Sequence, residues 1–331
     1  MQQWSETFSN LRMVCKFLAW AVVALLAGYA HAASITIGVS PSPMSLPLYV
    51  AEKQGYFRAE GVDVALLECP TGSACLKQLL ESKVQLATVS DLPIMFRSFE
   101  PVPFKVLATF ATSQDVQFIA RAGSGIRTTK DLKGRRVAVV RGAAGQYVLE
   151  LALLAAGVDP NAVSIVDLDL RRLDQAAANP AMEAFALFQP GAYQLGKLLG
   201  ADAVLLPVPK LYTLTFNLVA PSGHLAGSAE DHAKVLRALA RAVDFITVDP
   251  TTAKAIARQR LNMEAADIAL LWPNYRFGLT LNRSLVATLE STAQWAIHGQ
   301  LVKATALPNY LDFIDVGPLK QVRPAAVTVV K

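Results

Sequence analysis

Apolar positions alternate with small or polar ones at several places in the first third of the chain, and helical patterns lie between them. Ile35, Ile37 and Val39 predict a strand. A short helix is predicted over residues 48–53 and a second strand over 62–67. Ser73 is placed to cap a helix that contains Leu76 and Leu79. Segments 86–89, 105–110 and 116–120 also read as extended. This alternation of strand, loop and helix is typical of a parallel α/β sheet.

A second unit of the same kind follows a glycine-rich turn at residues 123–125. Strands are predicted over 137–140, 163–168, 185–188 and 204–206, and the segment 212–220 is again extended. The helix after the first of these strands places Leu149, Leu153 and Leu154 on one apolar stripe. From residue 229 onward the pattern is helical, with one apolar stripe formed by Val235, Leu239, Val243 and Ile246, and another by Leu285, Leu289 and Ala293.

The first 32 residues have the pattern of an export signal. Arg12 and Lys16 precede an apolar run over residues 17–29, and Ala30-His31-Ala32 has the small residues that signal peptidase requires. The run is shorter than the roughly 20 residues that span a bilayer. We therefore expect cleavage after Ala32 and a periplasmic protein that begins at Ala33.

The composition excludes several classes of protein. Of 331 residues, 53% are hydrophobic and 17% are charged, which excludes a disordered chain. The net charge of +5 is not gathered into basic runs, so the sequence gives no sign of nucleic-acid binding.

Two cysteines remain after the signal, Cys69 and Cys75. Because an exported protein meets an oxidising compartment, we favour a disulfide between them over two free thiols. No histidine lies nearby, so a metal site is not expected.

The sequence gives no positive support for enzyme chemistry. Gly191, Gly196 and Lys197 match part of a phosphate loop, but Leu198 stands where Ser or Thr must bind magnesium, and Leu195, Leu198 and Leu199 read as a buried stripe. The turn at residues 142–145 lacks the dinucleotide spacing, although it offers backbone N–H groups to an anion. His224, His232 and His298 are scattered. We expect neither a cofactor nor a bound metal.

Three segments carry a resemblance to a known family. These are PLYVAEKQGYF at 47–57 with EGVDV at 60–64, VQLATVSDLP at 84–93, and DLKGRRVAV at 131–139. The chain resembles the substrate-binding proteins of ABC importers for nitrate, aliphatic sulfonates, taurine, bicarbonate and thiamine-pyrimidine precursors. Together the matches span most of residues 34–200.

The resemblance implies a type II periplasmic binding protein fold, with two α/β lobes joined by two crossing strands near 112–121 and 212–220. Lobe 1 would comprise residues 33–118 and 216–331, and lobe 2 residues 119–215. The ligand contacts that the resemblance implies are Gly72, Ser73, Ser90, Asp91, Arg141, Gly142, Ala143, Gln146 and Gln189. Ser42 and Thr109 are expected contacts because they lie at the ends of predicted strands. Where the family often has Glu-Pro this chain has Gln189-Pro190, which argues against a cationic ligand. Arg141 could pair with an anionic group or point to solvent, and Asp91 could cap its helix or meet an ammonium.

The implied function is capture of a small, anionic organic solute. A sulfonate is the first candidate, and nitrate, a carboxylate or a pyrimidine are the next candidates. The partners would be an ABC permease and its ATPase at the inner membrane, and we expect a monomer. Two alternatives stay open. One is an enzyme of the same fold that acts on a pyrimidine precursor or small acid, and the other is a periplasmic component of a sensor.

Overall fold

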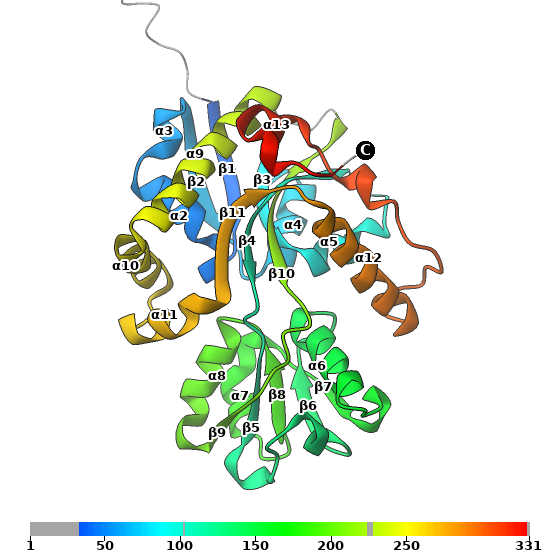
Figure 1. Cartoon of the computed structure of the whole chain (residues 1–331). Helices are drawn as coiled ribbons and strands as arrows, with labels where there is room; N and C mark the ends of the chain where they lie inside the picture. Colours follow the sequence, from blue (N-terminus) through cyan, green and yellow to red (C-terminus); the bar gives the residue numbers. More distant parts are fainter. Residues whose placement is uncertain (1–32, 102, 224–227, 330–331) are drawn as a thin grey trace, which may run out of the picture. The chain divides into compact units, whose positions relative to one another are not determined.

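The computed structural model describes residues 33–101, 103–223 and 228–329, which form two β-sheets with helices around them (Figure 1). The predicted signal peptide, residues 1–32, lies outside the described residues. Among the residues that are described, no helix combines the length and the apolar character needed to cross a membrane.

The first sheet has six strands in the order β11-β4-β10-β3-β1-β2. β1 pairs in parallel with β3, whereas β10 is antiparallel to both β3 and β4, and β11 is antiparallel to β4. The strands are β1 (Ala33–Val39), β2 (Val62–Glu68), β3 (Leu86–Ser90), β4 (Phe104–Ser113), β10 (Leu214–Pro221) and β11 (Tyr275–Thr280). The helices of this lobe are α2 (Leu46–Lys53), α3 (Tyr56–Ala59), α4 (Gly72–Leu80), α5 (Asp91–Ser98), α9 (Ala229–Val248), α10 (Pro250–Leu261), α11 (Ala265–Leu271), α12 (Arg283–His298) and α13 (Gly317–Val322).

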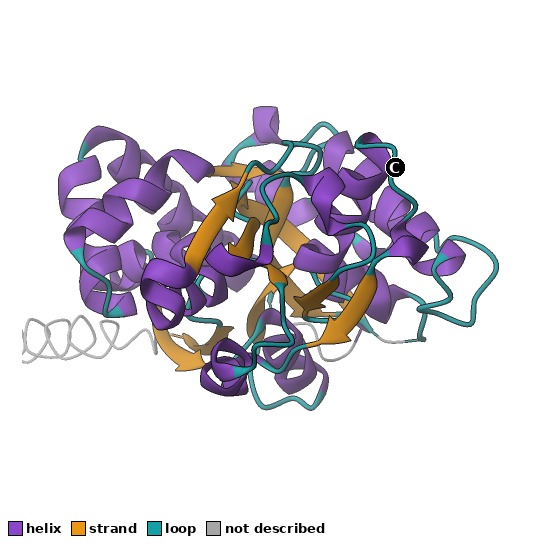
Figure 2. Ribbon diagram, turned by 90° about the horizontal axis from the view of Figure 1, so that it is seen from below, coloured by secondary structure: helices purple, strands orange, loops and turns teal. Residues whose placement is uncertain are grey.

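The second sheet has five strands in the order β7-β6-β8-β5-β9. β6 is parallel to both β7 and β8, and β5 is antiparallel to β8 and β9. The strands are β5 (Gln117–Arg121), β6 (Arg136–Val139), β7 (Ser164–Asp167), β8 (Ala184–Leu187) and β9 (Ala203–Leu206), and the helices are α6 (Ala144–Ala155), α7 (Leu173–Ala178) and α8 (Gly191–Leu199). Figure 2 shows helices to either side of the strands.

Two links carry the chain between the sheets. The first, residues 114–116, joins β4 of the first sheet to β5 of the second, and the second, residues 207–213, returns from β9 to β10. The chain is therefore an α/β protein of two lobes with two crossings, as predicted. The first crossing falls inside the predicted range, and the second begins a few residues before it.

Several local expectations were wrong. The segment after residue 229 is not wholly helical, because β11 pairs with β4 at the edge of the first sheet. Leu154 and Leu198, which we expected on buried stripes, are 61% and 52% exposed, whereas Leu149, Leu153, Leu195 and Leu199 are buried. The stripe of α9 is buried as predicted.

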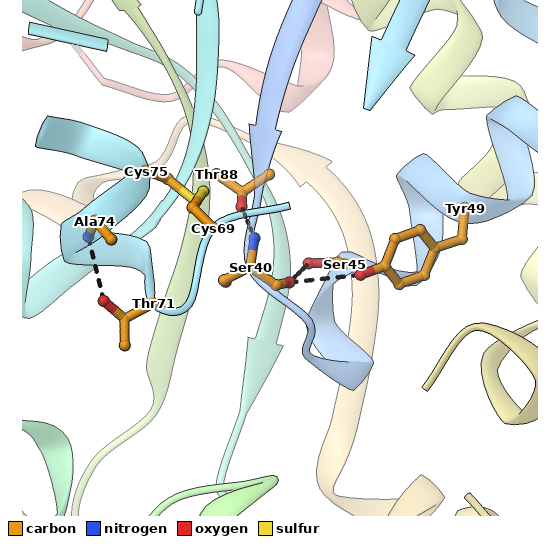
Figure 3. Close-up of a disulfide and its surroundings, with 8 residues drawn as sticks. All are labelled: Ser40, Ser45, Tyr49, Cys69, Thr71, Ala74, Cys75 and Thr88. Atoms are coloured by element: carbon orange, nitrogen blue, oxygen red, sulfur yellow. Dashed lines mark hydrogen bonds between the residues drawn. A yellow bond between two sulfur atoms is a disulfide. The ribbon is translucent and has the colours of Figure 1, made fainter. Parts of the chain in front are cut away.

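The predicted disulfide between Cys69 and Cys75 is present and buried (Figure 3). Its first cysteine also donates its backbone N–H to the carbonyl oxygen of Val39 at 3.0 Å. The second cysteine lies in the first turns of α4, so the bridge ties the N-terminal end of this helix to the ends of β1 and β2.

Replacing both cysteines, in C69A/C75A, is expected to lower the free energy of unfolding by about 2 kcal/mol, the amount for closing so short a loop in the chain-entropy model. Thermal unfolding of the oxidised wild type and the double variant measures the difference, expected at roughly 3 °C. Equal midpoints would show that the bridge adds no stability.

Candidate functional site

The predicted contact residues, with one exception, lie where strands end and helices begin. In the first lobe they follow β1, β2 and β3, and in the second they follow β6 and β8. The exception is Thr109, which lies inside β4 and not at a strand end as predicted. Because β6 and β8 run parallel, residues 141–146 and Gln189 leave the second sheet at the same edge. Helices α4, α5, α6 and α8 start at these strand ends.

In the first lobe, the loops after β1 and β2 are held by backbone and hydroxyl groups. The hydroxyl of Ser42 accepts the backbone N–H of Met44 at 3.2 Å. Thr71, and not Ser73 as predicted, caps α4, because its hydroxyl accepts the N–H of Ala74 at 3.2 Å while Ser73 is exposed (Figure 3). Gly72 is the first residue of that helix.

Asp91 is fully buried at the start of α5 and is held by three neighbours. Its carboxylate accepts the N–H of Leu92 at 2.8 Å, the N–H of Thr215 at 3.0 Å, and the hydroxyl of Tyr212. Burial raises its pKa to about 6, and these donors counteract that rise. Both carboxylate oxygens therefore have partners within the protein, although Asp91 is the first residue of α5 and not its N-cap.

Two other predicted contact residues of this lobe lie at a helix start and inside a strand. Ser90 occupies the N-cap position of α5, but its side chain makes no capping hydrogen bond. Thr109 is buried in β4, and its hydroxyl donates to Oδ1 of Asn217 in β10 at 2.6 Å. Thr109 thus joins two neighbouring strands of the sheet.

In the second lobe, the turn over residues 141–146 exposes a guanidinium, while the N–H groups of Gly142 and Ala143 are bonded to Gln146 and to the carbonyl oxygen of Val140. Arg141 is exposed, and its Nη2 donates to the carbonyl oxygen of Ile165 in β7 at 3.2 Å. Gly142 has φ +69°, in the left-handed region that favours glycine, and Ala143 is the N-cap of α6. Gln146 is buried and has protein partners at both polar atoms, Gly142 N–H and Glu150.

The N-terminus of α6 lies unusually close to β8, because residue 145 is glycine. A Cβ atom at this position would lie 2.1 Å from the carbonyl oxygen of Ala186. No side chain can be accommodated at such a distance from a backbone oxygen. Gly145 therefore allows the first turn of α6 to lie against the sheet beside the strand ends.

Gln189 is the predicted residue with an unused polar atom. Its side chain is buried, and Oε1 accepts the N–H of Tyr193 at 3.0 Å. Nε2 has no hydrogen-bond partner among the described residues. A buried donor without an acceptor costs about 1–3 kcal/mol, so this amide is poised to donate to an oxygen atom.

The sequence reasoning missed the residues that join the two lobes. Tyr147 of α6 is 3.0 Å from the hydroxyl of Ser291 in α12, and Trp295 of α12 donates to Glu150 at 2.6 Å. Tyr193 of α8 donates to Asp267 of α11, also at 2.6 Å. Each pair is separated by more than 70 residues in sequence, so no local pattern could indicate it.

A cavity of about 220 Å³ lies at the two crossings. It is lined by the two crossings and the strand ends beside them, namely residues 113–118 and Leu205, Leu206, Val208, Pro209, Lys210, Tyr212 and Leu214, and by Val148 and Asn274. None of the predicted contact residues lines it. Among the described residues, no group of three or more His, Cys, Asp or Glu is arranged to hold a metal ion.

Comparisons with known proteins agree with this architecture. A family model described as NMT1/THI5 like matches residues 42–253. The 4-amino-5-hydroxymethyl-2-methylpyrimidine phosphate synthase THI11 of Saccharomyces cerevisiae is 24% identical over 229 residues, which is 64% of this chain and 66% of that protein, slightly under two thirds of its length.

Two solved structures share the fold. The periplasmic aliphatic sulphonate binding protein SsuA from Escherichia coli has a TM-score of 0.73 at 18% identity, covering 86% of this chain and 92% of that one. The periplasmic nitrate-binding protein NrtA from Synechocystis PCC 6803 has a TM-score of 0.69 at 14% identity, covering 89% of each. At these identities the likeness shows the fold, which is that of the periplasmic binding proteins.

Proposed function

The chain belongs to the NMT1/THI5-like family, and from that premise we propose that it is a periplasmic solute-binding protein for a small anionic organic solute. The solute would bind between a lobe of residues 33–118 and 216–331 and a lobe of residues 119–215. An ABC permease and its ATPase at the inner membrane would receive it. A sulfonate is the first candidate, since solved proteins that share the fold include binders of sulfonate and nitrate.

The observation that carries the proposal is the unpartnered Nε2 of Gln189. It lies at the end of β8, at the sheet edge where α6 and α8 begin. An amide N–H donates to acceptors, and sulfonate, carboxylate and nitrate present only acceptor oxygens. A carboxylate at this position would instead repel them.

The helix starts supply further donors for an anion. The first turns of α4 and α6 leave backbone N–H groups unused within the helix, and the helix dipole adds partial positive charge there. Gly72 and Ser73 lie at the start of α4, and Ala144 and Gly145 lie at the start of α6, whereas the N–H groups of Gly142 and Ala143 are already bonded to Gln146 and to the carbonyl oxygen of Val140. An anion can therefore be held by amides and hydroxyls without a full counter-charge. Such a ligand favours closed lobes only as far as it makes better contacts in that state.

The proposal is tested first by thermal unfolding with a panel of solutes: taurine, ethanesulfonate, nitrate, bicarbonate, succinate and a hydroxymethylpyrimidine. A solute present at 100 times its Kd adds about 2.7 kcal/mol of stability, which raises the midpoint by roughly 4 °C. If every anion leaves the midpoint unchanged while a neutral heterocycle raises it, the anionic assignment is wrong.

Gln189→Glu is expected to weaken binding of the stabilising anion by about 10- to 100-fold, because a negative charge then faces the ligand in a buried setting. Calorimetric titration measures the change. Gln259→Glu makes the same substitution at an exposed position on α10 and serves as the matched control. Equal affinities in the two variants would remove Gln189 from the site.

The yeast relative favours a second candidate, an enzyme that acts on a pyrimidine precursor. Incubation of the purified protein with any solute that stabilises it, followed by mass spectrometry, separates the two. Unchanged solute supports binding and transport, and conversion of the solute supports the enzyme. A sensor role predicts solute binding as well, and is distinguished by a membrane kinase in place of a permease among the proteins that the chain contacts.

A further inference from the structure

Helix α6 of the second lobe contacts α12 of the first through two polar pairs and an aromatic cluster. Nε1 of Trp295 donates to Oε2 of Glu150 at 2.6 Å, and the hydroxyls of Tyr147 and Ser291 are 3.0 Å apart. The ring centroid of Trp295 lies 5.0 Å from that of Tyr147 and 6.4 Å from that of Phe96 in α5. We call these residues the α6–α12 contact.

The same contact continues back to the turn that precedes α6. Oε1 of Glu150, the other carboxylate oxygen, accepts Nε2 of Gln146 at 2.9 Å. Oε1 of Gln146 in turn accepts the N–H of Gly142 at 2.9 Å. The spacing of four residues places Gln146 and Glu150 on one face of α6, and the hydrogen bond from Gly142 links the preceding turn to that face. A chain of hydrogen bonds therefore runs from Trp295 of one lobe to the turn of the other.

The turn is also packed directly against the first lobe. A Cβ atom on Gly142 would lie 3.2 Å from Cε2 of Phe96, so the glycine backbone rests on the same ring that borders Trp295. Gln146 is buried, and both polar atoms of its side chain have partners within the protein. The orientation of the Gly142 N–H thus depends on the amide of Gln146, which Glu150 holds.

We propose that Glu150 is a positioning residue that couples closure of the two lobes at Trp295 to the geometry of the 141–146 turn. When Trp295 engages one oxygen of Glu150, the other oxygen is fixed on Gln146, and the turn is ordered before a solute arrives. A solute then binds with less ordering cost. The proposal rests on the proposed function for its effect on affinity, but the coupling itself exists without a ligand.

A second bridge between the lobes offers an internal comparison. Tyr193 of α8 donates to Asp267 of α11, and Lys197 is 3.4 Å from the same carboxylate. This bridge joins the lobes without contacting Gln146 or Gly142. Weakening it with Asp267→Asn is therefore expected to leave the 141–146 turn unchanged.

The experiment uses residues 33–331 with Trp272→Phe, which leaves Trp295 as the single tryptophan. Glu150→Gln keeps the shape of the side chain but offers one carbonyl oxygen in place of two, so Trp295 and Gln146 cannot both be satisfied. We expect a red shift of Trp295 emission and about tenfold faster hydrogen exchange of the Gly142 amide, both measured without ligand. Asp267→Asn should change neither.

In the presence of the stabilising solute, Glu150→Gln is expected to weaken binding about tenfold. Trp295→Phe should do the same, and the double variant should be no weaker than either single one. Unchanged Gly142 exchange in Glu150→Gln overturns the coupling. Failure of every solute to bind the wild type overturns the proposed function, while the emission and exchange measurements still decide the coupling.

Discussion

Gly145→Ala is expected to destabilise the protein by about 3 kcal/mol or more, an effect at the upper end for an added methyl group. The new Cβ would meet the backbone oxygen of Ala186, and a backbone atom in a central strand cannot move aside. The first turn of α6 must therefore lift away from β8. Urea unfolding measures the loss of stability, and we expect solute binding to weaken with it because the 141–146 turn moves too.

Gly196→Ala is the matched control for this variant. Gly196 lies within α8, and a Cβ built there has nothing within 4 Å. Since alanine favours helix over glycine by about 1 kcal/mol, this variant should be as stable as the wild type or more so. If Gly145→Ala unfolds at the same urea concentration as Gly196→Ala, α6 does not lie as close to β8 as the structure has it.

Stability is expected to rise as the pH falls from 7 to 5, because burial disfavours the charged form of two carboxyl groups. Burial raises the pKa of Asp91 and of Asp115 from 3.8 to about 6. The folded state therefore binds more protons than the unfolded state between these values. Their contribution to stability is full below pH 3.8 and is lost as the pH rises through 6, at about 3 kcal/mol for each group as an upper bound.

Asp115→Asn isolates one of the two groups. Its carboxylate accepts hydrogen bonds from the hydroxyls of Ser113 and Tyr275 at 2.9 and 3.1 Å, and hydroxyls can reverse their direction to suit an amide. The variant should gain stability at pH 7 and show a shallower rise toward pH 5. The buried His232, whose pKa is lowered, opposes the trend, and it does so equally in both proteins. Asp63→Asn, at an exposed position of β2, should keep the wild-type slope. Urea midpoints at pH 5, 6 and 7 that run parallel for wild type and Asp115→Asn would contradict this account.

The sequence pattern was sufficient to predict an element where the periodicity of its own apolar residues sets which face is buried. The alternation at residues 35–39 predicted β1, and the stripe of Val235, Leu239, Val243 and Ile246 predicted the buried face of α9. Three short motifs placed the chain in its family. The proximity of Cys69 and Cys75 in sequence was enough to predict their bridge.

Local pattern failed where a distant segment decides the outcome. β11 carries no strong alternation and is extended because the edge of β4 is open to it. Leu154 and Leu198 have the right residue type for a core, but no element covers them. Asp91 looked available for a ligand, yet Tyr212 and Thr215, more than 120 residues later, supply its partners.

The amino-acid sequence alone determined most strands and helices up to α9, the family and the disulfide, since each depends on spacing between near neighbours, but it did not indicate β11. Only the tertiary structure decided which polar atoms are left unpaired and which side chains connect the two lobes. Gln189 became the leading candidate because its Nε2 is buried without a partner, and Glu150 because Trp295 reaches it across 145 positions. Burial and hydrogen bonding depend on every element around an atom, so they appear only after the whole chain has folded.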